Sequence, residues 1–306
     1  MPRAERRSGW LPRWFWPAFA APAAAWLLIL FVIPFYVILS VAFGKLDPIF
    51  LTPTPVYDPL KWQFGSFTHV VGQVFTPGSI YASAFIRTIV YVGVATALSL
   101  AIGYPVAYFM ARHAGRFKMF FLIAFVAPFW ISYMMRMLAW ISLLQPNGYV
   151  NRVLVATHLA GHPVEWLSGR PSTVILGLTY GYIPYMILPL FGVLDRIDRS
   201  LLEAARDLGA SQIRTFVRVT LPLSRQAILA GCIIVSLPMF GDYFTQSLLA
   251  GTKNTSMLGN LIVDSVQSSL VVQGAALVLF LVLLLIVPIV YYVRSTGRAG
   301  QLLGAA

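Results

Sequence analysis

Charged residues are scarce in this sequence. They make up 10% of its 306 residues, whereas hydrophobic residues make up 58%, and an average soluble domain is about a quarter charged. A soluble protein of this length needs more polar surface than these residues provide. The charges also gather in short stretches between long apolar runs. This distribution predicts an all-α membrane protein that crosses the bilayer several times.

Cysteine and clusters of metal ligands are also scarce. Cys232 is the one cysteine and lies in an apolar run, which excludes an intrachain disulfide and does not suggest a thiolate cluster. We expect it to pack against a neighbouring helix. His158 and His162 have the i, i+4 spacing of a metal site, but Glu165 is the one further candidate ligand near them. We therefore expect no metal in this chain.

Six apolar segments are long enough to cross a bilayer, which takes roughly 20 largely apolar residues. They are 20–43, 83–111, 118–144, 172–194, 225–249 and 270–293. The basic N-terminus resembles a signal peptide, but the first segment is longer than the roughly 7–15 apolar residues of a cleaved signal. We interpret it as a retained helix. The segments define a transmembrane domain at 20–294, with an N-terminal tail at 1–19 and a C-terminal tail at 295–306.

Lysine and arginine predict the orientation, because loops rich in them stay in the cytoplasm. Fifteen of the 22 basic residues lie on one side of the spans and five on the other, with Arg87 and Arg136 inside spans. Both tails are therefore expected in the cytoplasm. Since the net charge of +12 resides in loops that set topology, we expect no nucleic-acid partner. Of the opposite loops, 44–82 shows no long helical pattern, and 146–171 suggests a turn, a short helix and a turn.

The cytoplasmic loop at 195–224 predicts two short helices. Ser200 and Glu203 form a Ser-x-x-Glu capping box at the start of the first. Gly209 suits the left-handed position that ends it, and Ser211 can cap a second helix before Pro222. From these residues alone, the loop could equally be an amphipathic helix lying on anionic lipid.

The same loop carries a spaced motif at Glu203, Ala204, Ala205, Gly209, Leu221 and Pro222. Its spacing resembles the EAA loop in the permeases of bacterial ATP-binding-cassette (ABC) importers, except at Val219, where that family has isoleucine. The resemblance implies the type I (MetI-like) permease fold in a bacterial inner membrane. It also implies that the loop is a coupling helix-turn-helix, which docks a separate ATPase.

The resemblance assigns roles to individual residues. Glu203 would offer a carboxylate to a partner arginine, Ala204 and Ala205 would allow close approach, and Gly209 would set the angle between the two helices. The sequence has no Gly-x-x-x-x-Gly-Lys-Ser/Thr loop, so ATP and Mg²⁺ would be bound by the partner, and this chain would have no cofactor and no catalytic residue. The other implied partners are a second homologous permease, two ATP-binding subunits and a periplasmic substrate-binding protein.

Two further segments concern the solute. Residues 125–151 and 236–262 resemble the corresponding stretches of spermidine/putrescine permeases, particularly the first of their two permease subunits. The resemblance implies that a polyamine is carried across the membrane by alternating access. Permeases for thiamine, ferric iron and other organic cations share parts of these segments, so these solutes remain alternatives.

Asp242 is the one acidic residue well inside a predicted span. An ionisable group at this depth is costly and marks a candidate site, and Phe240 and Tyr243 add rings that suit an organic cation. Pro238 and Gly241 could open the helix there. Alternatively, Asp242 pairs with Arg136 in a structural ion pair. Further candidates for the solute pathway are Trp130, Tyr133 and Asp264, although aromatic side chains in spans often only pack and Asp264 suits a solvated loop carboxylate.

Two other classes of membrane protein fit the sequence less well. A secondary transporter or channel driven by an ion gradient would be expected to carry several buried carboxylates or histidines, and this chain has one deep carboxylate. A membrane-embedded enzyme would need a nucleophile with its base or a cluster of metal ligands, and the spans show neither.

Overall fold

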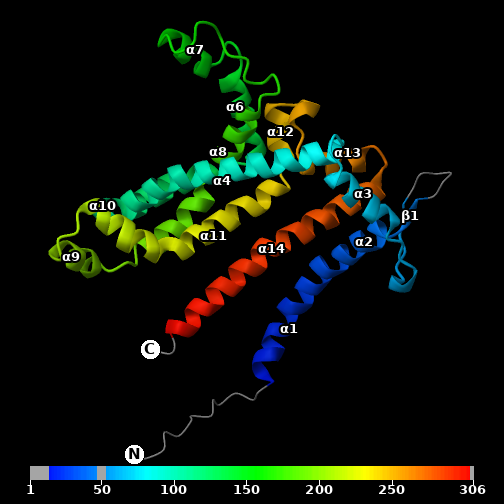
Figure 1. The fold of residues 1–306 in the computed structure, drawn as a ribbon, viewed down its shortest axis with the longest axis horizontal. Helices are drawn as coiled ribbons and strands as arrows, with labels where there is room; N and C mark the ends of the chain where they lie inside the picture. Colours follow the sequence, from blue (N-terminus) through cyan, green and yellow to red (C-terminus); the bar gives the residue numbers. More distant parts are fainter. Residues whose placement is uncertain (1–13, 47–52, 304–306) are drawn as a thin grey trace, which may run out of the picture.

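The computed structural model describes residues 14–46 and 53–303 (Figure 1). The described chain is helical except for its connections and one small antiparallel pair of strands, β1 (Lys45–Leu46) and β2 (Pro53–Thr54). Most of the tail expected at 1–19 lies outside the described residues, and α1 begins at Phe15. The tail expected from residue 295 starts as helix, because α14 continues to Leu303.

Five unbroken helices in the described part of the chain are long and apolar enough to cross a membrane. The first combines α1 (Phe15–Leu27), a π-helical turn η1 (Leu28–Val32) and α2 (Ile33–Ala42). The others are α4 (Ile80–Arg112), α8 (Pro171–Leu194), the helix Gln212–Phe240, and α14 (Val271–Leu303). They confirm five of the six predicted spans. The fifth is shifted toward the N-terminus, since it begins at Gln212 and ends at Phe240 rather than near residue 249.

The span predicted at 118–144 is not one continuous helix. It consists of α5 (Lys118–Val126), a 3₁₀ turn η4 (Ala127–Trp130) and α6 (Tyr133–Leu144), and the chain bends by 89° at the break. Pro128 cannot donate the backbone hydrogen bond that would continue α5. Ile131 and Ser132 then adopt extended conformations, with ψ of 138° and 139°. Counted as one span, the bent pair makes the sixth crossing.

The main core lies where α4, α8 and α11 (Leu221–Phe240) meet. Met186 of α8 is fully buried there between two glycines of the neighbouring helices. A Cβ on Gly231 would lie 2.7 Å from its Sδ, and a Cβ on Gly103 would lie 3.1 Å from its Cγ. Small residues at helix contacts let the backbones approach closely, as is common in membrane bundles.

The two ends of the bundle differ. At one end of α4 and α11 lie α9 (Arg199–Asp207) and α10 (Gln212–Thr215) (Figure 1). At the other end lie short helices that cap the bundle: α3 (Gly65–Phe75), α12 (Phe244–Leu249) and α13 (Leu258–Gln267). The short 3₁₀ turns are η2 (Pro59–Lys61), η3 (Gly115–Phe117) and η6 (Lys253–Thr255). Helix α3 was not expected within 44–82, whereas α7 (Tyr149–Ala156) confirms the short helix expected within 146–171.

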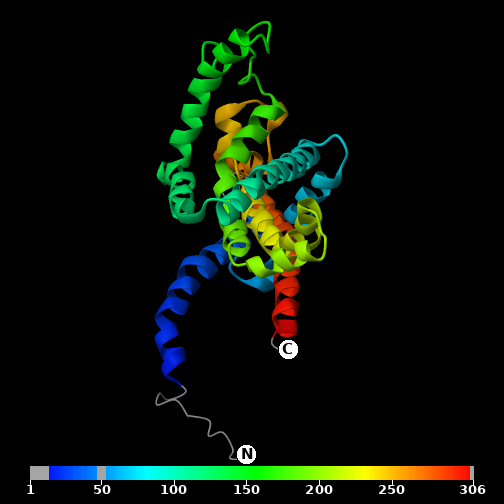
Figure 2. The same ribbon diagram turned by 90° about the vertical axis from the view of Figure 1, so that its left-hand side faces the viewer.

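Two parts project from this body in both views. One is α1, which is exposed along its whole length, and the other is the arm formed by α6 and α7 (Figures 1 and 2). Large apolar side chains on the arm are exposed, among them Met135 (61%), Tyr149 (71%) and Leu159 (77%). Lipid or another protein must cover apolar surface of this extent.

Candidate functional site

The site lies at the break between α11 and α12. Pro238 is inside the last turn of α11, the helix ends at Phe240, and Gly241 follows as its C-cap. Asp242 and Tyr243 form the connection before α12 begins at Phe244. The helix therefore opens where Pro238 and Gly241 suggested it could, and Asp242 stands beyond the end of a span rather than within a continuous helix.

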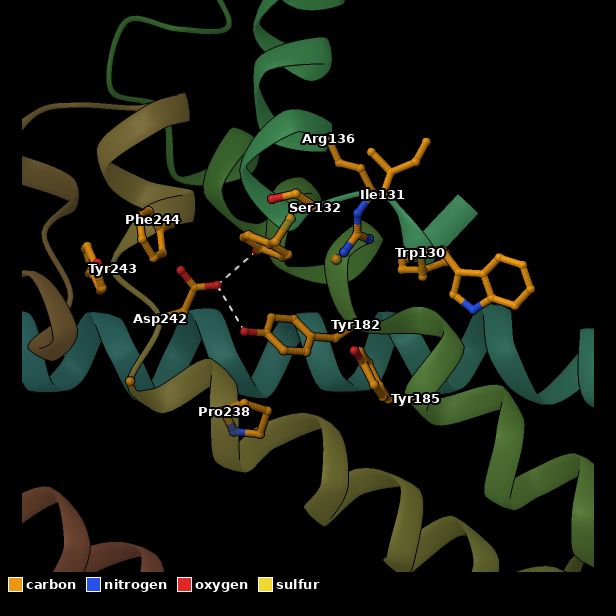
Figure 3. Close-up of a pocket in the computed structure, with 14 residues that line it drawn as sticks. Trp130, Ile131, Ser132, Arg136, Tyr182, Tyr185, Pro238, Asp242, Tyr243 and Phe244 are labelled. Carbon is orange, nitrogen blue, oxygen red and sulfur yellow. Dashed lines mark hydrogen bonds between the residues drawn. The ribbon is translucent and has the colours of Figure 1, made fainter. Parts of the chain in front are cut away.

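Asp242 is buried (8% exposed) and accepts four hydrogen bonds. Its Oδ1 accepts from the backbone N–H of Thr245 at 2.9 Å. Its Oδ2 accepts from the Thr245 hydroxyl at 2.7 Å and from Tyr133 at 2.9 Å. The same oxygen accepts from Tyr182 at 3.2 Å, a bond marked in Figure 3. Hydrogen bonds to a carboxylate are stronger than neutral ones. They hold the carboxylate in place and connect α6, α8 and α12.

Arg136 is also buried, but it does not pair with Asp242. Among the described residues no salt bridge joins the two side chains. The guanidinium instead lies over the rings of Phe129, 4.3 Å from the ring centroid, and Tyr133, at 5.3 Å. Its Nε and Nη1 atoms have no hydrogen-bond partner. The alternative of a structural ion pair is thus not what the structure shows, and the hydrogen bonds to Asp242 come from tyrosine and threonine hydroxyls and a backbone N–H instead.

A cavity of about 580 Å³ opens beside Asp242 and Arg136. Four of the residues proposed for the solute pathway line it together: Trp130, Tyr133, Asp242 and Tyr243. Tyr182, Tyr185, Phe129 and Phe244 add further rings to its wall, and the rings of Tyr243 and Phe244 stack with centroids 4.1 Å apart. The cavity therefore offers one carboxylate, one guanidinium and several aromatic faces.

Two other residues proposed for the pathway lie elsewhere. Phe240 packs against the apolar core rather than lining the cavity. Asp264 is exposed on α13, which packs against the start of α14, and lines a separate hollow of about 410 Å³ with Arg87 and Lys253.

Sequence reasoning did not include Tyr182 or Thr245. Tyr182 lies on α8, 60 residues before Asp242, and its ring centroid is 6.0 Å from that of Tyr133. A signal was present, because Tyr180, Tyr182 and Tyr185 put three phenol hydroxyls within six residues of one apolar span, and a buried tyrosine hydroxyl usually finds a partner. Which hydroxyl meets Asp242 depends on how α8 packs.

The loop at 195–224 differs in detail from its prediction. Helix α9 begins at Arg199, and its N-cap is Asp198, whose carboxylate accepts from the Ser200 N–H at 3.0 Å. The capping box predicted for Ser200 and Glu203 is therefore wrong, because the helix starts earlier. The Ser200 N–H lowers the pKa of Asp198 below its usual range. Gly209 has φ +82°, the left-handed conformation predicted for it.

The second short helix of this loop is not separate from the fifth span. Ser211 caps it as predicted, accepting from the Arg214 N–H at 3.4 Å. However, α10 continues through a π-helical turn, η5 (Phe216–Thr220), directly into α11. Pro222 lies at the start of α11 instead of in a break before it. The wider π-turn accommodates a proline that cannot donate the usual backbone hydrogen bond.

The residues proposed to dock the ATPase lie on this projecting loop and at the start of α11. Exposed are Glu203, Ala204, Gly209, Leu221 and Pro222, and Ala205 is partly buried. Two large apolar side chains beside them are strongly exposed, Leu208 at 89% and Ile213 at 77%. Where the loop leaves α8, Lys118 Nζ donates to both carboxylate oxygens of Asp195, at 2.9 and 3.0 Å. This ion pair ties the loop to the start of α5.

Comparisons with known proteins agree with this fold. Residues 99–297 match the family described as "Binding-protein-dependent transport system inner membrane component". The spermidine/putrescine transport system permease protein PotB of Escherichia coli K12 is 35% identical over 183 residues, 60% of this chain and 66% of that protein. PotB of Haemophilus influenzae is 33% identical over 238 residues, 78% of each chain.

Solved structures show the same fold at lower identity. A chain from the crystal structure of a bacterial alginate ABC transporter, in complex with an alginate pentasaccharide-bound periplasmic protein, superposes with a TM-score of 0.72. It is 16% identical, and the match covers 94% of this chain and 95% of that one. The fold is thus that of ABC importer permeases, which are non-catalytic, multi-pass components of the inner membrane. This chain belongs to the family of inner membrane components of binding-protein-dependent transport systems.

Proposed function

We propose that this chain is the polyamine-conducting permease subunit of an ATP-driven importer. The observation that carries the proposal is Asp242, a buried carboxylate at the broken end of α11 in a cavity walled by aromatic rings. Polyamines are flexible cations with apolar stems. A carboxylate suits their ammonium groups, and aromatic faces suit both the cations and the methylene chain.

The size of the cavity is compatible with such a solute. Its volume of about 580 Å³ lies within the roughly 300–1,000 Å³ of small-molecule sites. The relatives from Escherichia coli and Haemophilus influenzae are named for spermidine and putrescine, which supports the same class of solute for this chain.

Energy would come from outside the chain. A partner ATPase would bind ATP and Mg²⁺ and dock on the exposed residues Glu203, Ala204, Ala205, Gly209, Leu221 and Pro222. The complete importer would contain a second homologous permease, two ATP-binding subunits and a periplasmic substrate-binding protein, and it would work by alternating access. Both termini would lie in the cytoplasm, on the same side as α9, since the loop and the ends of α1 and α14 share the basic side of the sequence.

Uptake by the assembled importer in proteoliposomes tests the proposal. With ATP supplied to the ATPase, we expect uptake of labelled spermidine or putrescine, and Asp242→Asn should lower it about 30-fold or more, because a buried charged partner is lost. The matched control is Asp58→Asn, an exposed carboxylate in an outer connection, which should leave uptake unchanged.

The same assay separates the alternatives. Uptake of thiamine, ferric ion or another organic cation in place of polyamines would replace the proposed solute. Uptake by the chain alone along an ion gradient, with no ATPase present, would contradict the ATP-driven class itself.

A further inference from the structure

Two of the three guanidinium nitrogens of Arg136 have no acceptor among the described residues. Arg136 is 8% exposed, and its Nε and Nη1 atoms are buried without a hydrogen-bond partner among the described residues. The ring of Phe129 at 4.3 Å stabilises the cation but does not replace an oxygen acceptor. Burying a charge without a hydrogen-bonded partner is strongly unfavourable.

Asp242 does not provide that acceptor. Both of its oxygens accept hydrogen bonds from Thr245, Tyr133 and Tyr182. Figure 3 shows the guanidinium pointing into the cavity, where no other carboxylate is drawn, and the residues that line the cavity include no acid besides Asp242. The described residues that line the cavity therefore offer this guanidinium no carboxylate besides Asp242.

Lipid does not meet the requirement either. Two side chains that line the cavity with Arg136 are apolar and exposed, Trp130 (82%) and Ile131 (56%). Hydrocarbon tails can cover these side chains, but they offer no hydrogen-bond acceptor to a guanidinium. The apolar rim and the unpartnered charge together call for a protein surface that carries an acceptor.

A transported polyamine would not neutralise Arg136. It carries no carboxylate, and its ammonium groups repel a guanidinium. Arginine also stays protonated in proteins, so its charge needs an acceptor in every state of the transporter, including when the cavity is empty. A resident carboxylate meets this condition, whereas a passing solute does not.

We infer that a carboxylate of the second permease closes over this cavity and pairs with Arg136. The inference rests on the proposed function, which supplies the second permease. Arginine and carboxylate form paired, charge-assisted hydrogen bonds, and Trp130 and Ile131 form an apolar rim beside that contact. Arg136 then orients the partner subunit across the pathway and is shielded from the cationic solute.

Co-purification of the two permeases tests the contact. With a tag on this chain, we expect Arg136→Glu to lower the amount of co-expressed second permease recovered about 30-fold or more, because two buried carboxylates would face each other. Arg170→Glu makes the same charge change at an exposed outer position and should not change recovery. The monodispersity of each variant in detergent shows whether it has folded.

Charge exchange locates the partner residue and guards against simple misfolding. In the Arg136→Glu background, each acidic residue of the second permease is changed to arginine in turn, and one of these changes should restore recovery. Equal recovery with Arg136→Glu and the wild type, or failure of every exchange to restore it, would overturn the inference.

A comparison of two solutes tests whether the carboxylate belongs to the solute instead of the second permease. If the wild-type importer favoured ornithine over putrescine, and Arg136→Gln lost only that preference while keeping the second permease, the carboxylate would belong to the solute and the inference would fail. In another outcome, Arg136→Glu loses the second permease and the wild-type importer moves no polyamine. That outcome would support the contact and refute the proposed solute.

Discussion

The docking loop and the cavity are built in different ways. In the docking loop, Asp198, Gly209 and Ser211 shape α9 and its turn through contacts within a few residues. In the cavity, Tyr133 and Tyr182 come from two helices and Asp242 from the connection between two others, and Tyr133 and Asp242 are 109 residues apart in the chain. Local chemistry is therefore readable from short motifs, whereas a site shared by several helices depends on their packing.

The largest expected effect is in the docking loop. Gly209→Pro cannot keep φ at +82°, since proline holds φ near −65°, so α9 should lose its angle to α10. We expect ATP-driven uptake to fall about 100-fold, toward the upper end of typical coupling between two sites. ATP hydrolysis and uptake are measured on the same proteoliposomes.

Gly192→Ala is the control for the glycine substitutions, because it lies in α8 with open space around its added Cβ. It should behave as wild type. Tight coupling of ATP hydrolysis to uptake in Gly209→Pro would show that the angle at this turn does not matter for docking.

A smaller effect is expected in the cavity. A Cβ on Gly181 would lie 2.7 Å from Cε2 of Tyr133 and 2.9 Å from its hydroxyl oxygen. Gly181→Ala should push this ring aside and remove its hydrogen bond to Asp242, which lowers polyamine uptake about 10-fold, as expected for a hydrogen bond to a charged group.

For Gly181→Ala, the informative measurement compares ATPase binding with polyamine uptake. Binding of the ATPase should stay normal, because Gly181 lies in the wall of the cavity, 13 residues before the end of α8, where the loop begins. A loss of ATPase binding as large as the loss of uptake would show that the two regions are not independent.

The smallest effect concerns the cap of α9. Asp198→Ala removes the acceptor for the Ser200 N–H, and amide hydrogen exchange in the first turn of α9 should rise a few-fold. Because this hydrogen bond lowers the pKa of Asp198, its stabilisation is present above the ordinary aspartate pKa of about 3.9 and is lost as pH falls through the lowered value.

In the wild type, amide exchange in the first turn of α9 should therefore rise as the pH falls through the lowered pKa of Asp198. Mass spectrometry measures this exchange. In Asp198→Ala the same step should be absent. An equal rise in both proteins would assign the pH dependence to another group.

The third span shows the limit of reading helices from apolar length. Residues 118–144 are largely apolar, and Pro128 lies within this run much as Pro184 and Pro189 lie within the next one. Pro184 and Pro189 indeed stay inside the continuous α8, whereas the chain bends by 89° after Pro128. The difference lies in the extended residues Ile131 and Ser132 and in the contacts of α6 with α12, which no local pattern reveals.

The sequence by itself determined the membrane class, five of the spans and the left-handed turn at Gly209. These follow from apolar length and from short-range backbone chemistry, which act along the chain. The tertiary structure decided that Tyr133, Tyr182 and Thr245 surround Asp242 and that Phe240 and Asp264 lie outside the cavity. It also left two guanidinium nitrogens of Arg136 without an acceptor among the described residues. These outcomes depend on helix packing and on the break after Pro128, because a buried charge is matched by whichever side chains the fold brings to it.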